Sequence, residues 1–218
     1  MSHHLHGQAR STGRLPIAIV VAAGAFTFLF LHPGDGFWIQ LAGTATGLSA
    51  LAILLDAPGM RSQLRRPPQG WIHSILTAVL AAAALYGIFL VGRAISVRIL
   101  SAASSRIADI YELKGSASER QIAAWLLLVI GPCEEFFWRG YVQRSMQALF
   151  GLAGVAGSAL LYAAVHVSSG NLMLVGAALV CGLFWGGLYA HFRSLWINAL
   201  CHALWALVIF VLWPIPPG

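Results

Sequence analysis

The sequence predicts an all-α fold, a polytopic membrane helical bundle with about seven transmembrane helices. Of the 218 residues, 59% are hydrophobic and only 9% are charged, which is too apolar for a soluble domain with one core. Apolar runs approach the roughly 20 residues that a helix needs to cross a hydrocarbon core about 30 Å thick. The chain lacks the alternating segments of a membrane β-barrel, so helices are the expected spanning structure.

Seven apolar segments are the expected spans. They run approximately over residues 15–31, 37–55, 71–92, 121–141, 148–167, 171–192 and 195–213. In the sixth span, Gly182 and Gly186 are four residues apart, a spacing that lets neighbouring helices approach closely.

The distribution of arginine predicts the orientation, because Lys and Arg accumulate in cytoplasmic loops. The loop 32–36 between the first two spans contains neither residue. Arginines do precede the first span and follow the second, and these are Arg10, Arg14, Arg61, Arg65 and Arg66. The N-terminus is therefore expected to be cytoplasmic, and seven crossings place the C-terminus outside.

The chain is expected to divide into four parts. A cytoplasmic tail, 1–14, precedes the N-terminal transmembrane helices at 15–92, and residues 121–213 form four further transmembrane helices. Between them, residues 93–120 hold five Lys and Arg among apolar residues at roughly helical spacing. We interpret this segment as an amphipathic helix in the membrane interface, which simple alternation assigns to the outer side.

The basic residues and the cysteines argue against other classes. Thirteen Lys and Arg stand against seven Asp and Glu, but they are scattered singly, so we expect no nucleic-acid partner. Cys133, Cys181 and Cys201 lie in apolar surroundings without a CxxC spacing. Packed free thiols are therefore expected, rather than a disulfide or a metal site.

Ionisable side chains inside the spans are few. Each costs roughly 2.5–3.5 kcal/mol on insertion scales, so such residues are usually paired and usually functional. The candidates are Glu134, Glu135 and Arg139 in the fourth span, His166 ending the fifth, and His202 in the seventh, where Asn198 adds an amide one turn earlier.

Helical geometry separates the two glutamates. Glu135 and Arg139 are four residues apart and share a face, which predicts an ion pair. Glu134 points about 100° away and shares its face with Trp138, so it has no charged partner in its own helix. A carboxylate in that position is a plausible general base toward water.

Glu134, His166 and His202 would converge from three helices if the last four spans form a bundle. Such convergence in an apolar bundle is typical of an intramembrane active site. A polar network that only fixes helix register is the alternative, and the residues alone leave both open.

Three short motifs resemble the CAAX protease and bacteriocin-processing family of glutamic intramembrane proteases. EEFFWR matches its EExxxR motif, YAAVH resembles its second motif, and HALWA resembles its third; they occur in the family's order on successive spans. The resemblance covers roughly residues 121–213 and implies a catalytic core of four transmembrane helices there.

The resemblance also implies residue roles. Glu134 and His166 would activate the attacking water, His202 would lie on the oxyanion side, and Glu135 with Arg139 would hold the site together. No metal ligands and no cofactor are implied.

Two positions depart from the family's pattern. Tyr162 stands where the family favours Phe, and Ala206 stands where the third motif has Asn. Alanine cannot donate a hydrogen bond, and loss of one oxyanion donor commonly costs on the order of 10²–10³ in rate. Asn198, one turn to the other side of His202, is a candidate to supply the missing amide.

Together these features predict an intramembrane endopeptidase of the CAAX-protease type. Its partners would be a membrane protein or peptide substrate and the lipid bilayer, and we expect a multi-pass protein of the cell membrane, the inner membrane of a bacterium. One alternative is a zinc-dependent membrane endopeptidase, because one Glu and two His form a plausible ligand set. Another is a noncatalytic membrane protein that binds a partner or confers bacteriocin immunity, for which Ala206 is the best support.

Overall fold

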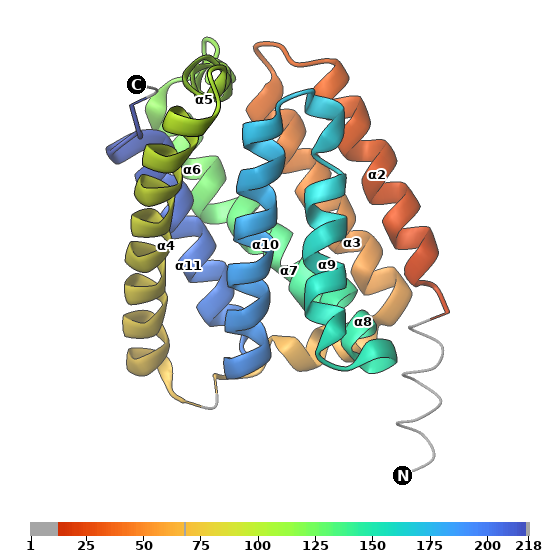
Figure 1. Ribbon diagram of the computed structural model, residues 1–218. Helices are drawn as coiled ribbons and strands as arrows, with labels where there is room; N and C mark the ends of the chain where they lie inside the picture. The colour runs from red at the N-terminus through yellow and green to blue at the C-terminus, as the bar shows by residue number, and fades with distance from the viewer. Residues whose placement is uncertain (1–12, 68, 217–218) are drawn as a thin grey trace.

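The computed structural model describes residues 13–67 and 69–216, so most of the expected tail 1–14 lies outside the described residues. The described part forms helices and no strand, and the helices pack side by side in a bundle (Figure 1). The first helices are α2 (Leu15–Leu31), α3 (Phe37–Gln63), α4 (Trp71–Ile99) and α5 (Ala103–Glu112). The last are α9 (Ala153–Ala164), the 3₁₀ turn η3 (Val167–Ser169), α10 (Leu172–Phe192), α11 (Leu195–Leu207) and η4 (Val208–Leu212).

One uninterrupted helical rod, Glu119–Phe150, lies between these two groups and carries both glutamates. It alternates α-helical and π-helical turns. Its parts are α6 (Glu119–Trp125), η1 (Leu126–Ile130), α7 (Gly131–Phe137), η2 (Trp138–Gln143) and α8 (Arg144–Phe150).

Five described helices are long and apolar enough to cross a membrane: Phe37–Gln63, Trp71–Ile99, Glu119–Phe150, Leu172–Phe192 and Leu195–Leu212. Leu15–Leu31 and Ala153–Ser169 are apolar but shorter. The prediction of an all-α, multi-pass membrane bundle is therefore confirmed, with five long spans and two shorter apolar helices at the seven expected positions.

The boundary between the fourth and fifth expected spans is wrong. The rod continues to Phe150, beyond the expected end at 141, and α9 begins only at Ala153, after the expected start at 148. Gly151 separates the two helices with φ of 58° and ψ of −138°, a backbone conformation that essentially only glycine adopts. Apolar residues continue across this corner, so hydrophobicity alone did not locate it.

Asp56 interrupts α3 next to the expected end of the second span at residue 55. Its φ of −153° and ψ of 64° are not helical, and Pro58 follows two residues later. The Asp56 carboxylate accepts a hydrogen bond from the Gly59 N–H at 3.1 Å and pairs with Arg144 of α8. This contact joins the end of α3 to the end of the rod.

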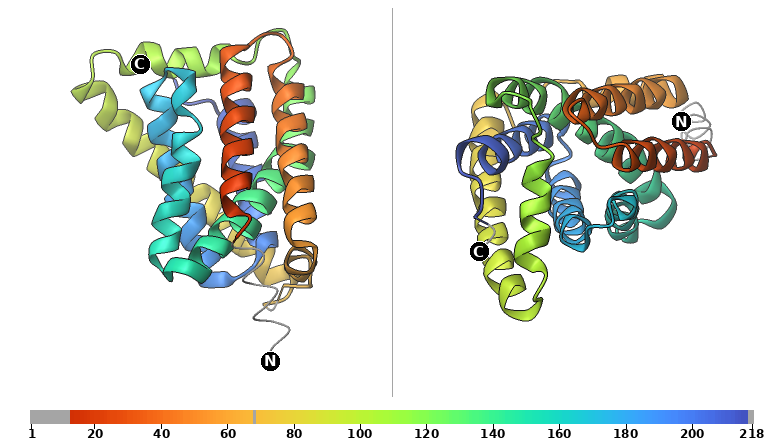
Figure 2. Two further views of the ribbon diagram at one scale, coloured as in Figure 1. Left: turned by 90° about the vertical axis from the view of Figure 1, so that its right-hand side faces the viewer. Right: turned by 90° about the horizontal axis from the view of Figure 1, so that it is seen from above.

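The expected amphipathic segment 93–120 is divided among three helices, and its last two residues begin α6. Its first residues extend α4 to Ile99, and α5 then runs across one end of the bundle (Figure 2). In α5, Ala103 and Ile107 are buried, whereas Arg106 and Asp109 form an exposed ion pair at 3.6 Å. The α3–α4 connection lies at the opposite end of the bundle (Figure 1), as alternation of the spans predicts.

A π-helical turn precedes Pro132 in the middle of the rod. Proline has no N–H to donate and disturbs the regular helical ladder, and the Gly131 N–H bonds back five residues to the Leu126 carbonyl. Ser49 of α3 donates to the Cys133 carbonyl at 2.8 Å. This irregular segment, supported by α3, immediately precedes Glu134.

Glycines set the spacing of the helices around the site. A Cβ atom on Gly131 would lie 3.0 Å from the Ala203 backbone of α11, and one on Gly182 would lie 3.0 Å from Cα of Ala159 in α9. Both approaches are closer than a side chain normally allows, so the predicted close contact at Gly182 is confirmed. The thiols of Cys133, Cys181 and Cys201 are free, also as expected.

Candidate active site

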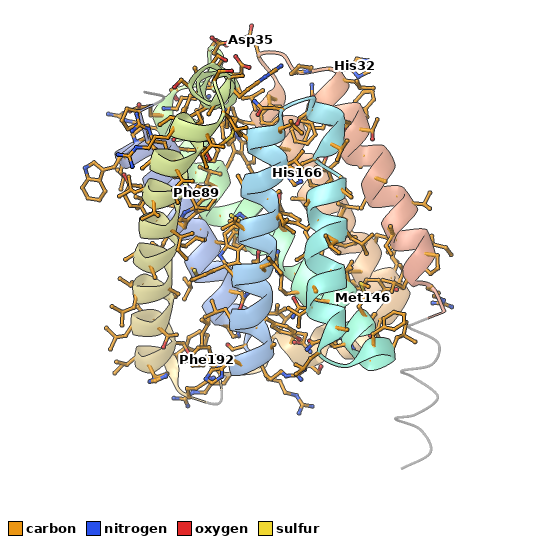
Figure 3. The ribbon with its side chains drawn as sticks, in the orientation of Figure 1. His32, Asp35, Phe89, Met146, His166 and Phe192 are labelled. Carbon is orange, nitrogen blue, oxygen red and sulfur yellow. The ribbon has the colours of Figure 1, made fainter. Side chains whose placement is uncertain are left out.

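An apolar cavity of about 490 Å³ lies inside the bundle. Glu134 of α7, His166 after α9 and His202 of α11 all line it, together with Tyr162. Figure 3 places His166 in the half of the bundle nearer α5. Further lining comes from apolar side chains of α2, α4, α5 and α10, including Phe26, Phe89, Ile107 and Val180. The three residues predicted to converge are thus brought to one cavity.

The Glu134 carboxylate has one hydrogen-bond partner among the described residues. The Tyr162 hydroxyl donates to its Oε2 at 2.9 Å, and only 6% of the residue's surface is exposed. Its other oxygen, Oε1, accepts no hydrogen bond from the described part of the chain. That oxygen is left to interact with water or substrate in the cavity.

The His166 ring is held by the backbone carbonyl of Tyr162 and by aromatic rings. Its Nδ1 lies 2.7 Å from the Tyr162 carbonyl, which can only accept, so Nδ1 carries the proton. The neutral ring then has an unprotonated Nε2. Phe26 and Phe30 of α2 lie against the imidazole with ring centroids 5.3 and 5.5 Å away, and the centroid of the Tyr162 ring is 5.0 Å away.

Glu135 is fully buried and belongs to a different network. The predicted ion pair is present, with Arg139 Nη1 2.9 Å from Glu135 Oε1. His202 Nδ1 also lies 2.9 Å from Oε1, and Asn198 Nδ2 lies 3.2 Å from Oε2. Glu135 therefore organises α7, η2 and α11, and it does not line the cavity.

Arg139 extends this network to α10. Its Nη2 lies 3.5 Å from the Cys181 carbonyl and 3.4 Å from the Gly182 carbonyl. Its guanidinium lies 5.0 Å from the ring centroid of Tyr162 and 5.3 Å from that of Trp185. The buried charge is thus compensated by a carboxylate, two carbonyls and two aromatic faces.

His202 is fixed on two sides. Glu135 accepts from its Nδ1, and the Trp185 ring is stacked on the imidazole with centroids 3.9 Å apart and planes 19° from parallel. Its other ring nitrogen, Nε2, has no hydrogen-bond partner among the described residues. A group oriented in this way can interact with a polarised carbonyl through Nε2.

The expectation that Asn198 supplies an amide to the cavity is not met. Its Nδ2 donates to Glu135 Oε2 at 3.2 Å and to the Trp185 carbonyl at 2.8 Å, so both amide hydrogens are used. Asn198 is fully buried and does not line the cavity, whereas Ala206 does. Asn198 supports Glu135, and position 206 remains without a donor.

Sequence reasoning missed two contacts of the site. The Tyr162 hydroxyl was overlooked, although a buried tyrosine usually needs a partner for its hydroxyl and the departure from Phe was visible. The stacking of Trp185 on His202 had no signal in the sequence, because Trp185 is one of several aromatic residues in an apolar helix.

The described residues do not form a metal site. No group of three or more His, Cys, Asp or Glu in residues 13–67 and 69–216 is arranged to hold a metal ion. The zinc alternative needs one Glu and two His around one ion, and the described residues of the site form no such group.

Fold and site together define a class, a multi-pass α-helical membrane protein with a buried Glu, His and Arg network beside an apolar cavity. Residues 117–208 match the family described as type II CAAX prenyl endopeptidase Rce1-like. All three motifs lie within this match, so the resemblance to this family is confirmed over residues 117–208. Comparisons with curated proteins and with solved structures gave no match.

Proposed function

We propose that this protein is a glutamic-type intramembrane endopeptidase that hydrolyses a peptide bond in a membrane-associated protein or peptide. The observation that carries the proposal is the shared cavity of Glu134, His166 and His202, which reach it from three separate helical segments. Amide hydrolysis without a metal needs a general acid–base, a further hydrogen-bond acceptor for the water and a group that stabilises the oxyanion. Glu134, His166 and His202 could supply these three functions at one apolar site.

Glu134 and His166 would activate a water molecule. The free Glu134 Oε1 would accept a proton from the water, and His166 Nε2 would accept its second hydrogen bond. The water oxygen would then attack the carbonyl carbon of the substrate. Glu134 would deliver its proton to the leaving amine when the peptide bond breaks.

His202 would stabilise the negative oxygen of the tetrahedral intermediate. Because Nδ1 is committed to Glu135, donation through Nε2 requires the imidazolium form. In the intermediate Glu134 is protonated, so the two negative charges would be Glu135 and the oxyanion, against two cations, Arg139 and His202. This balance of charge supports the assignment, since unpaired buried charges are strongly disfavoured.

Ala206 limits the expected rate. It lines the cavity at the position where the third motif of the family has Asn, and no amide side chain among the described lining residues replaces that donor. A single imidazolium would then carry the stabilisation of the oxyanion. We infer an enzyme that works without a metal and more slowly than relatives with two donors.

The remaining features of the proposal concern the whole chain. We propose that residues 1–14 are cytoplasmic, that 15–92 and 93–120 support the site, and that 121–213 form the catalytic core. The substrate would reach the cavity from the bilayer of the cell membrane, in a bacterium the inner membrane. We expect no nucleic-acid partner.

The proposal is tested by finding a cleaved substrate. Membranes from cells expressing the wild type or Glu134→Gln at equal levels would be compared by labelling of protein N-termini. We expect new protein N-termini only in membranes with the wild type, located within or beside apolar segments of the cleaved substrate. Identical termini in both samples would contradict it.

A noncatalytic binding function is a second candidate because one specific observation, Ala206 in the cavity wall, favours it. In that case the charged network would fix the helix register and the cavity would only bind a peptide. The discriminating result would be wild-type protein that cleaves nothing while Ala206→Asn produces new N-termini.

A further inference from the structure

Tyr162 touches both residues that would activate water. Its hydroxyl donates to Glu134 Oε2 at 2.9 Å, and its carbonyl accepts from His166 Nδ1 at 2.7 Å. The carbonyl contact belongs to the backbone, so any residue at this position would make it. The hydroxyl contact depends on tyrosine, and it is the only hydrogen bond to the Glu134 carboxylate from the described residues.

Neighbouring rings fix the direction of the Tyr162 side chain. Trp138 makes an edge contact with a centroid distance of 5.2 Å and an interplanar angle of 74°. The Arg139 guanidinium lies 5.0 Å from the ring centroid, and the His166 ring is 5.0 Å away. With 6% of its surface exposed, Tyr162 has little freedom to turn its hydroxyl elsewhere.

We propose that Tyr162 is a positioning residue, whose hydroxyl orients the Glu134 carboxylate. This inference rests on the proposed function. By holding Oε2, it fixes the carboxylate plane and keeps Oε1 toward the cavity. Without the hydroxyl, the terminal torsion of Glu134 is broad and unrestrained, because no other described donor holds it. The Glu134 carboxylate would then spend less time in the orientation that takes the proton from water.

Tyr162→Phe tests this role because it removes only the hydroxyl and keeps the ring contacts and the carbonyl bond to His166. The matched control is Tyr189→Phe. Tyr189 is also buried, its hydroxyl donates to Gln63 at 2.8 Å, and it does not line the cavity. Both variants lose one buried tyrosine hydroxyl bond, but only one of these bonds reaches Glu134.

The kinetic arm uses a peptide that spans the cleavage site identified with wild-type membranes, reconstituted with the purified protein in phosphatidylcholine vesicles. Tyr162→Phe is expected to lower kcat roughly 10- to 100-fold, the range of a lost hydrogen bond to a charged group, with KM within about twofold. Tyr189→Phe should leave both within about twofold. A Tyr162→Phe enzyme with wild-type kcat would overturn the proposal.

Infrared spectroscopy of the Glu134 carboxyl group is a second test, and it needs no substrate. The carboxyl and carboxylate bands of Glu134 are assigned as those absent from Glu134→Gln, and they are then followed in the other variants. Tyr162→Phe should shift these bands and Tyr189→Phe should not; an unshifted band in Tyr162→Phe would also overturn the proposal. If the wild type cleaves no protein, the proposed function fails, and the infrared arm alone decides whether Tyr162 holds Glu134.

Discussion

Glu135 Oε1 accepts from both His202 Nδ1 and Arg139 Nη1, each at 2.9 Å, while the carboxylate of the adjacent Glu134 has the Tyr162 hydroxyl as its one hydrogen-bond donor among the described residues. Neighbouring glutamates in one helix therefore belong to separate networks. Glu135 is fully buried in a cluster that joins α7, η2 and α11, and Glu134 lines the cavity. Their substitutions should have different consequences, for stability in one case and for chemistry in the other.

Glu135→Ala should lower the free energy of unfolding of the bundle. It leaves Arg139 buried without its carboxylate and removes the partner of His202, and breaking a buried pair in this way costs about 3–5 kcal/mol. The free energy of unfolding in lipid bicelles would measure the loss. Glu134→Gln, measured alongside, should lose no more than about 1–2 kcal/mol, and equal losses for both variants would contradict the division of roles.

Ala206→Asn should accelerate cleavage. Ala206 lines the cavity of about 490 Å³, and an asparagine amide there would give the oxyanion a second donor, which no Asn or Gln among the described lining residues supplies. The gain in kcat should be up to the order of 10²–10³, by analogy with the loss seen when one such donor is removed. The double variant Glu134→Gln, Ala206→Asn is the control and should be inactive; an unchanged or lower kcat for the single variant would count against the oxyanion assignment.

Gly182→Ala should destabilise the contact between α9 and α10. Its Cβ would lie 3.0 Å from Ala159 Cα and 3.1 Å from Ala159 Cβ, and such overpacking costs typically about 1–3 kcal/mol. Gly187→Ala is the matched control in the same helix, because nothing lies within 4 Å of its added Cβ. Thermal unfolding of both variants in detergent should show a lower Tm only for Gly182→Ala.

Removal of divalent metal should leave cleavage unchanged. No group of three or more His, Cys, Asp or Glu among the described residues is arranged to hold a metal ion. Activity after dialysis against a chelator, and the zinc content of the purified protein, would check this. Loss of activity on chelation that is restored by added zinc would favour a metallopeptidase instead.

Much of the fold could be predicted from sequence because a bilayer imposes a simple length rule on helices. The start and end of α2 agree with the first expected span, and α10 agrees with the sixth within a residue. The corner at Gly151 and the break at Asp56 are different, because they depend on backbone conformation rather than on hydrophobicity. The ion pair between Glu135 and Arg139 was predictable, because a spacing of four residues brings two side chains together on one face of a helix.

Contacts between helices were not predictable in the same way. Helical spacing placed Asn198 on the face of His202, but it could not show that the amide would be used by Glu135 and the Trp185 carbonyl. The partner of His202 was likewise hidden, because it depends on the close approach of Gly131 to Ala203. Only the tertiary packing reveals that the His202 imidazole is bonded to Glu135 rather than to Glu134.

The central claim is that Glu134 is the base that activates water. Its most direct test is the rate of cleavage of the identified peptide by purified Glu134→Gln in vesicles, with unfolding stability confirmed to be close to that of the wild type. Glutamine keeps the shape and an acceptor for Tyr162 but cannot take a proton, so cleavage should fall to background. A Glu134→Gln protein that cleaves the peptide at the wild-type rate would contradict the account.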